Sequence, residues 1–127
     1  MAFGELLRHT IKSNLEVNSL FREAERSVQK NLIVLIAEEI PERDHTGRVA
    51  YLAGRRLGSA PERNRAKRRL RTAARLEGAP WEGLRVVLVA REACLDAEFA
   101  RIRQDIQRGL GAVQSRLKRE KPSAEGF

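Results

Sequence analysis

The side chains best suited to chemistry in this chain are cations, concentrated in the middle of the sequence. Between Arg48 and Arg75 there are ten basic residues and a single acid, Glu62, so this segment carries a net charge of +9 while the whole chain carries +8. Acids four positions away would balance these charges on an ordinary solvated helix, and here they are missing. Because clustered Lys and Arg release counterions from phosphates, the segment predicts a binding site for a polyanion.

The alternative is a solvated basic helix face with no partner, and the confinement of the charge to one element argues against it. Composition does not separate RNA from DNA. Asn64 and Thr72 are the few short polar residues in the helix that could read base edges, which favours recognition of phosphates and shape. The candidate RNA contacts are Arg55, Arg56, Arg63, Asn64, Arg65, Lys67, Arg68, Arg69 and Arg71.

The remaining chemically capable side chains predict no catalytic or metal site. His9 and His45 lack the spacing of a metal motif, and Cys94 has no histidine partner in a nucleophile pattern. A group of acids surrounds a predicted turn and is best interpreted as a solvated surface: Glu38, Glu39, Glu42 and Asp44. We therefore expect no catalytic residue in the protein itself.

The first half of the chain predicts one helix and two strands. Ser13 followed by Glu16 is a capping box that opens an amphipathic helix over 13–25. The β-branched run 32–37, which could begin as early as Ser27, predicts a buried strand. A turn over 41–47 separates it from a second strand over 49–53, and we expect the two strands to form an antiparallel pair.

The second half predicts a crossover unit and a final helix. A helix over 61–77 starts with Pro61 in its first turn, and a strand over 84–90 follows. Asp96 is expected to cap the last helix, which ends near residue 117. The order is helix, strand, strand, optionally a further strand, then helix, strand, helix, which predicts an α+β sandwich of one small mixed sheet covered by helices.

The length of 127 residues predicts one domain over 13–117, between an irregular segment over 1–12 and a disordered tail over 118–127. One cysteine allows no internal disulfide, which fits a reducing compartment. The start has no signal-peptide pattern and no apolar run approaches membrane-spanning length, so we expect a cytoplasmic protein that does not contact membranes.

The segment "RVAYLAGRRLGSAPERNRAKRRLR" (48–71) resembles the signature of the bacterial ribonuclease P protein component. In that family a strand leads through a basic pair and a glycine-containing turn into an Arg-Asn-Arg-x-Lys-Arg helix. The expected order of elements over roughly residues 11–117 also agrees with the family. The matching positions are Arg55, Arg56, Gly58, Ala60, Arg63, Asn64, Arg65, Lys67 and Arg68.

The resemblance implies a non-catalytic protein cofactor of a ribonucleoprotein. Such proteins bind the large catalytic RNA through the Arg-Asn-Arg helix and contact the 5′ leader of precursor tRNA through a cleft between the first helix and the sheet. The RNA performs the hydrolysis with Mg²⁺ bound mainly by the RNA subunit and the substrate. The protein alone binds no Mg²⁺ tightly, and no protein partner is required. The resemblance also implies a left-handed strand-helix-strand crossover, against the general right-handed rule.

The chain departs from the family at the expected leader cleft. Val17 stands where family members usually carry Phe, although Phe21 occupies the second aromatic position, and Ile33 stands at a strand position that is often aromatic. Since aliphatic side chains offer contact area without a π face, base stacking is expected to be weaker here. Tyr51 on the neighbouring strand is a further candidate for this cleft.

Two other functions are compatible with a basic α+β domain. A ribosomal or RNA-assembly protein could use the same helix on RNA without any role in tRNA processing. A stand-alone nuclease is the third hypothesis, and the lack of an acidic cluster beside the basic helix argues against it.

Overall fold

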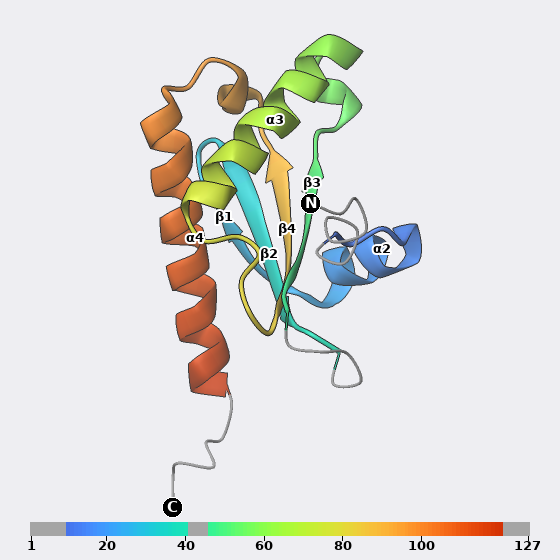
Figure 1. Ribbon diagram of the computed structural model, residues 1–127, viewed down its shortest axis with the longest axis vertical. Helices are drawn as coiled ribbons and strands as arrows, with labels where there is room; N and C mark the ends of the chain where they lie inside the picture. Colours follow the sequence, from blue (N-terminus) through green and yellow to red (C-terminus); the bar gives the residue numbers. More distant parts are fainter. Residues whose placement is uncertain (1–9, 41–45, 121–127) are drawn as a thin grey trace, which may run out of the picture.

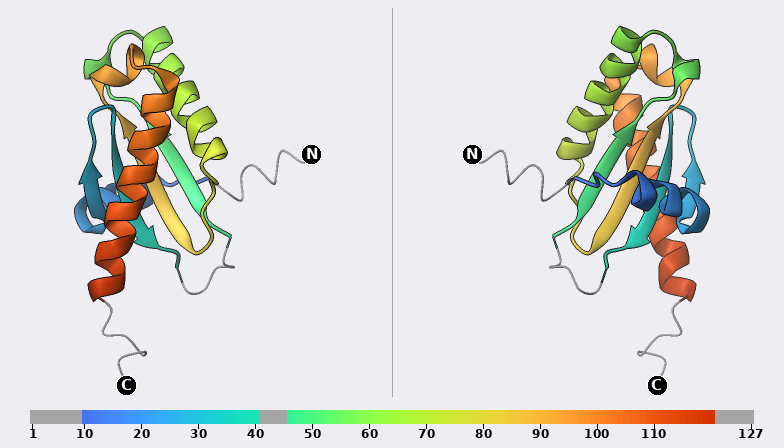
Figure 2. Two further views of the ribbon diagram at one scale, coloured as in Figure 1. Left: turned by 90° about the vertical axis from the view of Figure 1, so that its left-hand side faces the viewer. Right: turned by 90° about the vertical axis from the view of Figure 1, so that its right-hand side faces the viewer.

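The computed structural model describes residues 10–40 and 46–120, and they form a single mixed sheet with helices on both faces. Figures 1 and 2 show α3 (Ala60–Leu76) and α4 (Phe99–Glu120) on one face and α2 (Asn14–Glu23) on the other. The predicted α+β class is confirmed. Most of the expected lead-in, turn and tail lie outside the described residues, but α4 continues to Glu120, so the boundary expected at residue 118 was wrong.

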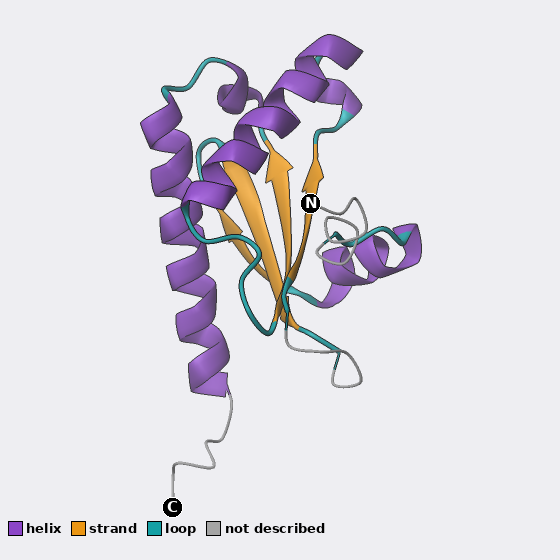
Figure 3. Ribbon diagram, in the orientation of Figure 1, coloured by secondary structure: helices purple, strands orange, loops and turns teal. Residues whose placement is uncertain are grey.

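The sheet contains β1 (Glu25–Val28), β2 (Leu32–Glu38), β3 (Arg48–Leu52) and β4 (Leu84–Ala90), in the order β1-β2-β4-β3. β2 and β4 are antiparallel, whereas β3 and β4 are parallel. The expected antiparallel pair of β2 with β3 was wrong, because β4 lies between them (Figure 3). β4 is thus distant in sequence from both of the strands that pair with it. A prediction that pairs strands adjacent along the chain therefore gives the wrong neighbour.

β1 is a separate strand and not the start of β2. A tight turn joins the two strands, in which the backbone N–H of Gln29 donates to the carbonyl of Leu32 at 2.8 Å. Asp105 of α4 holds this turn, because its Oδ2 accepts from the backbone N–H of Asn31 at 2.9 Å and from Asn31 Nδ2 at 2.8 Å. Extending the predicted strand back to Ser27 merged two strands that this turn separates.

The crossover from β3 through α3 to β4 is left-handed. In Figure 1 the parallel strands β3 and β4 point upward, α3 lies in front of the sheet, and β4 lies to the left of β3. A right-handed connection would place β4 on the other side. The handedness implied by the family resemblance is therefore present.

Helix α3 begins and packs as its sequence predicts, within one residue at each end. Ser59 and Glu62 form a capping box, and Pro61 lies in the first turn, where its missing N–H is not needed. A stripe of mostly small side chains packs on the sheet: Ala66, Leu70, Ala73 and Ala74, all buried. These short side chains bring the helix backbone close to the strands, while the remaining surface is cationic.

The expected cap of the last helix was wrong. Asp96 closes a short 3₁₀ helix, η2 (Glu92–Leu95), and α4 begins three residues later, where the carbonyl of Glu98 accepts from Arg101 and Ile102. Gly109 lies within α4, and a Cβ at this position would collide with Val34 Cγ2 of β2. The glycine therefore allows the helix and the sheet to approach closely.

The side chains of each strand divide between two cores. The larger core lies under α3 and α4 and contains Val34, Val86 and Leu88. The smaller core lies under α2, where Leu20 packs with Leu35, Ala50 and Val87. Among the residues that the structure describes, no helix is both long and apolar enough to cross a bilayer.

Candidate nucleic-acid interface

The cations of α3 and the preceding 3₁₀ turn η1 (Arg55–Leu57) form one exposed basic surface. Arg55, Arg56 and Arg68 are exposed, and Arg63 and Lys67 are half-buried along the flank of the helix. Within residues 10–40 and 46–120, no acid forms a salt bridge with any of these five side chains. The sequence-predicted cluster is therefore brought together, and its charge is not neutralised from within the described structure.

The one acid of this segment, Glu62, is used in the helix cap and forms no salt bridge with these five cations. Its Oε1 accepts from the backbone N–H of Ser59 at 2.8 Å, and this bond holds the pKa of the Glu62 carboxyl below its ordinary value. Ser59 Oγ donates to the same oxygen at 3.0 Å. Ser59 and Glu62 have the spacing of a capping box, so the sequence contained this signal.

Arg69 and Arg65 differ from the other cations because they bind protein. Arg69 donates to the carbonyl oxygens of Cys94, Leu95 and Ala97, including a bond of 2.5 Å to Cys94. Arg65 donates to the Leu95 carbonyl at 2.5 Å. These bonds fix α3 against η2, so Arg69 orients the helix that carries the other predicted RNA contacts.

Arg71 lies over the ring of Tyr51, with its Cζ 5.2 Å from the ring centroid. Burial raises the pKa of Tyr51, and the positive charges of Arg71 and Arg75 partly offset that rise. Tyr51 therefore belongs to the α3 face of the sheet and packs against the larger core. The suggestion that Tyr51 lines the cleft beside α2 was wrong, because alternate side chains of β3 point to opposite faces.

A row of aliphatic side chains crosses the α2 face of the sheet beyond the part that Leu20 covers. Strand register places Val28 opposite Ile33, Ile33 opposite Val89, and Leu52 opposite Val89. Val28 is 55% exposed, and the other three are half-buried. The row is an apolar floor that is open to solvent, and it contains no aromatic ring.

Two residues of α2 face this open row. On a helical wheel Val17 and Phe21 lie on one side of Leu20 and Glu16 lies on the other. Glu16 binds the arginines at the opposite end of the sheet, so Val17 and Phe21 flank the aliphatic row. Val17 packs with the smaller core, and Phe21 is 38% exposed. Three of the four predicted cleft residues, Val17, Phe21 and Ile33, are thus on the α2 face.

A buried ion cluster holds α2 to the sheet. Arg48 Nε donates to Glu39 Oε2 at 2.7 Å, and Arg85 Nη1 donates to Glu16 Oε2 at 3.1 Å. Burial alone would raise the pKa of Glu16, but hydrogen bonds from Arg48 and Arg85 outweigh it and lower the pKa. Hydrogen bonds to Glu39 and Glu16 raise the pKa of Arg48. The sequence placed Arg48 in the basic segment, and no signal there indicated its ion pairs with Glu16 and Glu39.

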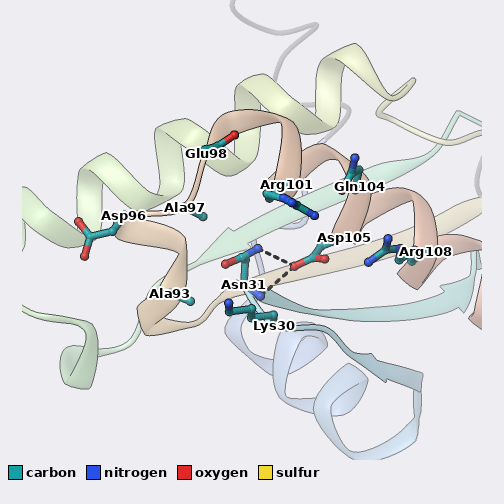
Figure 4. Close-up of a pocket in the computed structure, with 10 residues that line it drawn as sticks. All are labelled: Lys30, Asn31, Ala93, Asp96, Ala97, Glu98, Arg101, Gln104, Asp105 and Arg108. Carbon is teal, nitrogen blue, oxygen red and sulfur yellow. Dashed lines mark hydrogen bonds between the residues drawn. The ribbon is translucent and has the colours of Figure 1, made fainter.

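A hollow of about 610 Å³ lies between η2, the β1–β2 turn and the start of α4 (Figure 4). Its charged lining is balanced, with the cations Lys30, Arg101 and Arg108 and the acids Asp96, Glu98 and Asp105. Asp105 is buried and bonded to Asn31 (Figure 4). The hollow therefore lacks the excess of one charge that marks the surface of α3.

No group of three or more His, Cys, Asp or Glu side chains gathers to hold a metal ion in the described part of the chain. The buried thiol of Cys94 has a pKa raised by burial, which makes it a poor nucleophile. What the described surface offers chemically is phosphate binding by α3 and η1 and apolar contact beside α2.

Comparisons with known proteins agree with this geometry. Residues 7–114 match the family model described as Ribonuclease P. The chain is 35% identical over 103 residues to the ribonuclease P protein component of Symbiobacterium thermophilum, covering 78% of this chain and 85% of the relative. It is 40% identical over 80 residues to the component of Caulobacter vibrioides, covering 60% of this chain and 52% of that protein.

Solved structures share the fold at lower sequence identity. The ribonuclease P protein of Staphylococcus aureus superposes with a TM-score of 0.69 at 20% identity, covering 82% of this chain and 94% of that one. The protein of Thermotoga maritima gives a TM-score of 0.65 at 20% identity, covering 84% and 96%. The mixed sheet and its covering helices are therefore an arrangement already seen in experimental structures.

Proposed function

The chain belongs to the ribonuclease P protein component family, and from that premise we propose that it binds the catalytic RNA of ribonuclease P and the 5′ leader of precursor tRNA. In this role it promotes removal of the leader to give mature tRNA 5′ ends. The protein is a cofactor within an endoribonuclease, and the RNA subunit performs the hydrolysis.

The observation that carries this proposal is the set of unneutralised cations on η1 and α3. Arg55, Arg56, Arg63, Lys67 and Arg68 have no acidic partner in the described part of the chain, and Arg65 and Arg69 anchor the helix that presents them. A helix with this charge repels itself unless a polyanion binds it. We assign the catalytic RNA to this surface, with phosphates as its main contacts.

We assign the leader to the aliphatic row beside α2. Val28, Ile33, Val89 and Leu52 form a continuous apolar floor across all four strands. Val17 and Phe21 form the wall, and Phe21 is the one aromatic side chain at this wall that the structure describes. A single-stranded leader can lie on such a floor by shape and apolar contact, with stacking limited to Phe21.

Mg²⁺ belongs in this proposal to the RNA subunit and the substrate, where it would stabilise charge at the cleaved phosphodiester. The residues of this chain bind and orient RNA around that site. We also place the protein in the cytoplasm, where precursor tRNA is made in bacteria. No second protein is needed for this role.

The test is cleavage of a precursor tRNA by a bacterial ribonuclease P RNA at low Mg²⁺, with and without this protein. We expect marked stimulation of leader removal and no cleavage by the protein alone. The same assay uses Arg68→Met, which removes one exposed cation, and Arg108→Met, which removes a cation from α4, as a matched pair. Loss of stimulation should be confined to Arg68→Met.

Tight RNA binding without any stimulation, repeated with the cognate RNA, would contradict the proposal. It would favour a ribosomal or assembly-type protein that uses the same basic helix. Cleavage by the protein alone that persists after RNase-free preparation and repurification would instead indicate a nuclease.

A further inference from the structure

A second groove lies on the α3 side of the edge strand β3, on the opposite face of the sheet from α2. It has a volume of about 430 Å³. Val49, Tyr51 and Pro80 supply apolar surface, Thr10 lies at one side, and Arg71 and Arg75 supply the charge. Grooves of this size commonly hold small organic groups when a few polar residues converge on them.

The charge of this groove has one sign. Neither Arg71 nor Arg75 forms a salt bridge within the described residues, and no acid is among the residues that line the groove. Arg71 is further fixed by its position over the Tyr51 ring, at 5.2 Å from the centroid. A fixed guanidinium loses little conformational entropy when an anion binds to it.

The groove continues the basic flank of α3. Arg63, Lys67, Arg71 and Arg75 recur every four residues, so they lie along one side of the helix with a rise of about 6 Å between neighbours. An RNA strand held by the first two cations would therefore be led toward the groove at the other end. The groove then combines apolar surface, against which a base can pack, with two arginines that can bind its phosphate.

We propose that this groove binds one unpaired nucleotide of the RNA partner, with its phosphate on Arg71 and Arg75 and its base against Tyr51, Val49 and Pro80. The inference rests on the proposed function, in that RNA is the partner of α3, and it adds a nucleotide subsite separate from the leader cleft. The base and the phosphate are both needed, since the aromatic ring contacts the base and the guanidinium groups bind the phosphate.

The chain contains a single tyrosine, so the ring signals of Tyr51 report on the groove alone. The experiment follows these signals by NMR in the full-length protein during titration with hexauridylate, uridine 5′-monophosphate, uridine and inorganic phosphate. We expect saturable shifts with hexauridylate and with the monophosphate, and much smaller shifts with uridine or phosphate alone. Tyr51 signals that stay unchanged while the backbone signals of α3 shift with hexauridylate would overturn the proposal.

Substitutions separate the two parts of the site. Arg75→Gln should reduce the salt dependence of hexauridylate binding by about 0.7 log–log units, the value for one phosphate contact on a single strand. Tyr51→Leu should weaken that binding about fivefold or more, provided that its thermal unfolding stays cooperative. Arg108→Gln, which removes an arginine that lines the hollow of Figure 4, is the matched control and should change neither quantity. Equal effects of Arg75→Gln and Arg108→Gln would contradict a specific site.

Precursor cleavage distinguishes the failure of this inference from failure of the proposed function. If the wild-type protein stimulates cleavage but Tyr51 does not respond to nucleotides, the groove proposal is wrong and the cofactor role stands. If Tyr51 responds as expected but the protein never stimulates cleavage, the groove is an RNA subsite in a protein of different function.

Discussion

Arg48 of β3 and Glu16 of α2 form a bidentate ion pair, with Nη1 to Oε1 at 2.9 Å and Nη2 to Oε2 at 2.6 Å. The Arg48 side chain is only 7% exposed. Because α2 also carries the proposed wall of the leader cleft, this pair fixes the position of Val17 and Phe21 over the sheet.

Glu16→Gln should reduce the free energy of unfolding by about 1–3 kcal/mol, because it removes charge-assisted bonds and leaves the two arginines less well paired. The folded pKa of Glu16 lies below its ordinary value of 4.5. Its stabilising effect is therefore complete above that pH and is lost as pH falls through the folded pKa. Urea unfolding at pH 7 and pH 3 should show a difference between variant and wild type that shrinks in acid. A constant difference would contradict the role of ionised Glu16.

Arg69→Met and Arg68→Met should separate positioning from RNA binding on neighbouring residues. Arg69 donates to three carbonyls near η2, so its loss should cost about 1–3 kcal/mol of stability and leave the salt dependence of RNA binding nearly unchanged. Arg68→Met should change stability by less than about 0.5 kcal/mol and lower the log–log salt slope by about one unit. Thermal unfolding and RNA binding at several salt concentrations measure both. If Arg68→Met lowered stability and Arg69→Met lowered the salt slope, Arg68 would be the positioning residue and Arg69 the RNA contact.

Val17→Phe should raise affinity for a single-stranded leader, because it adds an aromatic face beside the aliphatic row at Ile33. The expected gain is about 1 kcal/mol, at the lower end of stacking energies. Leu15→Phe adds the same ring at a position that is 82% exposed on another side of α2, and it should give no gain. Binding of precursors with and without a leader measures the effect. An equal affinity for wild type and Val17→Phe would indicate a cleft that works by shape and backbone contact.

Gly109→Ala and Gly111→Ala should have opposite effects on stability. A methyl group at Gly109 collides with Val34, so overpacking should cost about 1–3 kcal/mol. Nothing lies within 4 Å of the corresponding position at Gly111, where alanine should add about 0.5–1 kcal/mol through its better helix propensity. Denaturant unfolding of the two variants makes the comparison. Stabilisation by both changes would mean that α4 can move away from β2.

The elements of the fold were predictable where local sequence determines them. β-branched runs located β2 and β4, and Pro61 with the alanine stripe located α3 within one residue at either end. Strand pairing was not predictable in the same way, because β4 inserts between β2 and β3 through contacts distant in sequence. Asp96 is a residue type that favours helix N-caps, yet it lies at the C-terminal end of η2, where its backbone N–H donates to the carbonyl of Ala93.

The candidate site was predictable as a surface but not as a set of roles. The excess of positive charge confined to one segment indicated α3 as the candidate site. This excess can be counted from the sequence without knowledge of the binding partner. Arg69 could not be separated from Arg68 by type, since its carbonyl partners lie 25 or more residues further along the chain. Tyr51 was assigned to the wrong face because the phase of β3, which sets the direction of each side chain, depends on its tertiary packing.

Side chains alternate between the two faces of the sheet along β3, so the number of residues in this strand is constrained as tightly as their types. Arg48, Ala50 and Leu52 face α2, whereas Val49 and Tyr51 face the α3 side. Deleting or inserting one residue between Arg48 and Tyr51 would exchange the two sets downstream of the change. Leu52 would then point into the arginine-lined groove, and Tyr51 would join the aliphatic row. We would therefore expect homologous chains to tolerate substitutions within β3 far more readily than changes in its number of residues.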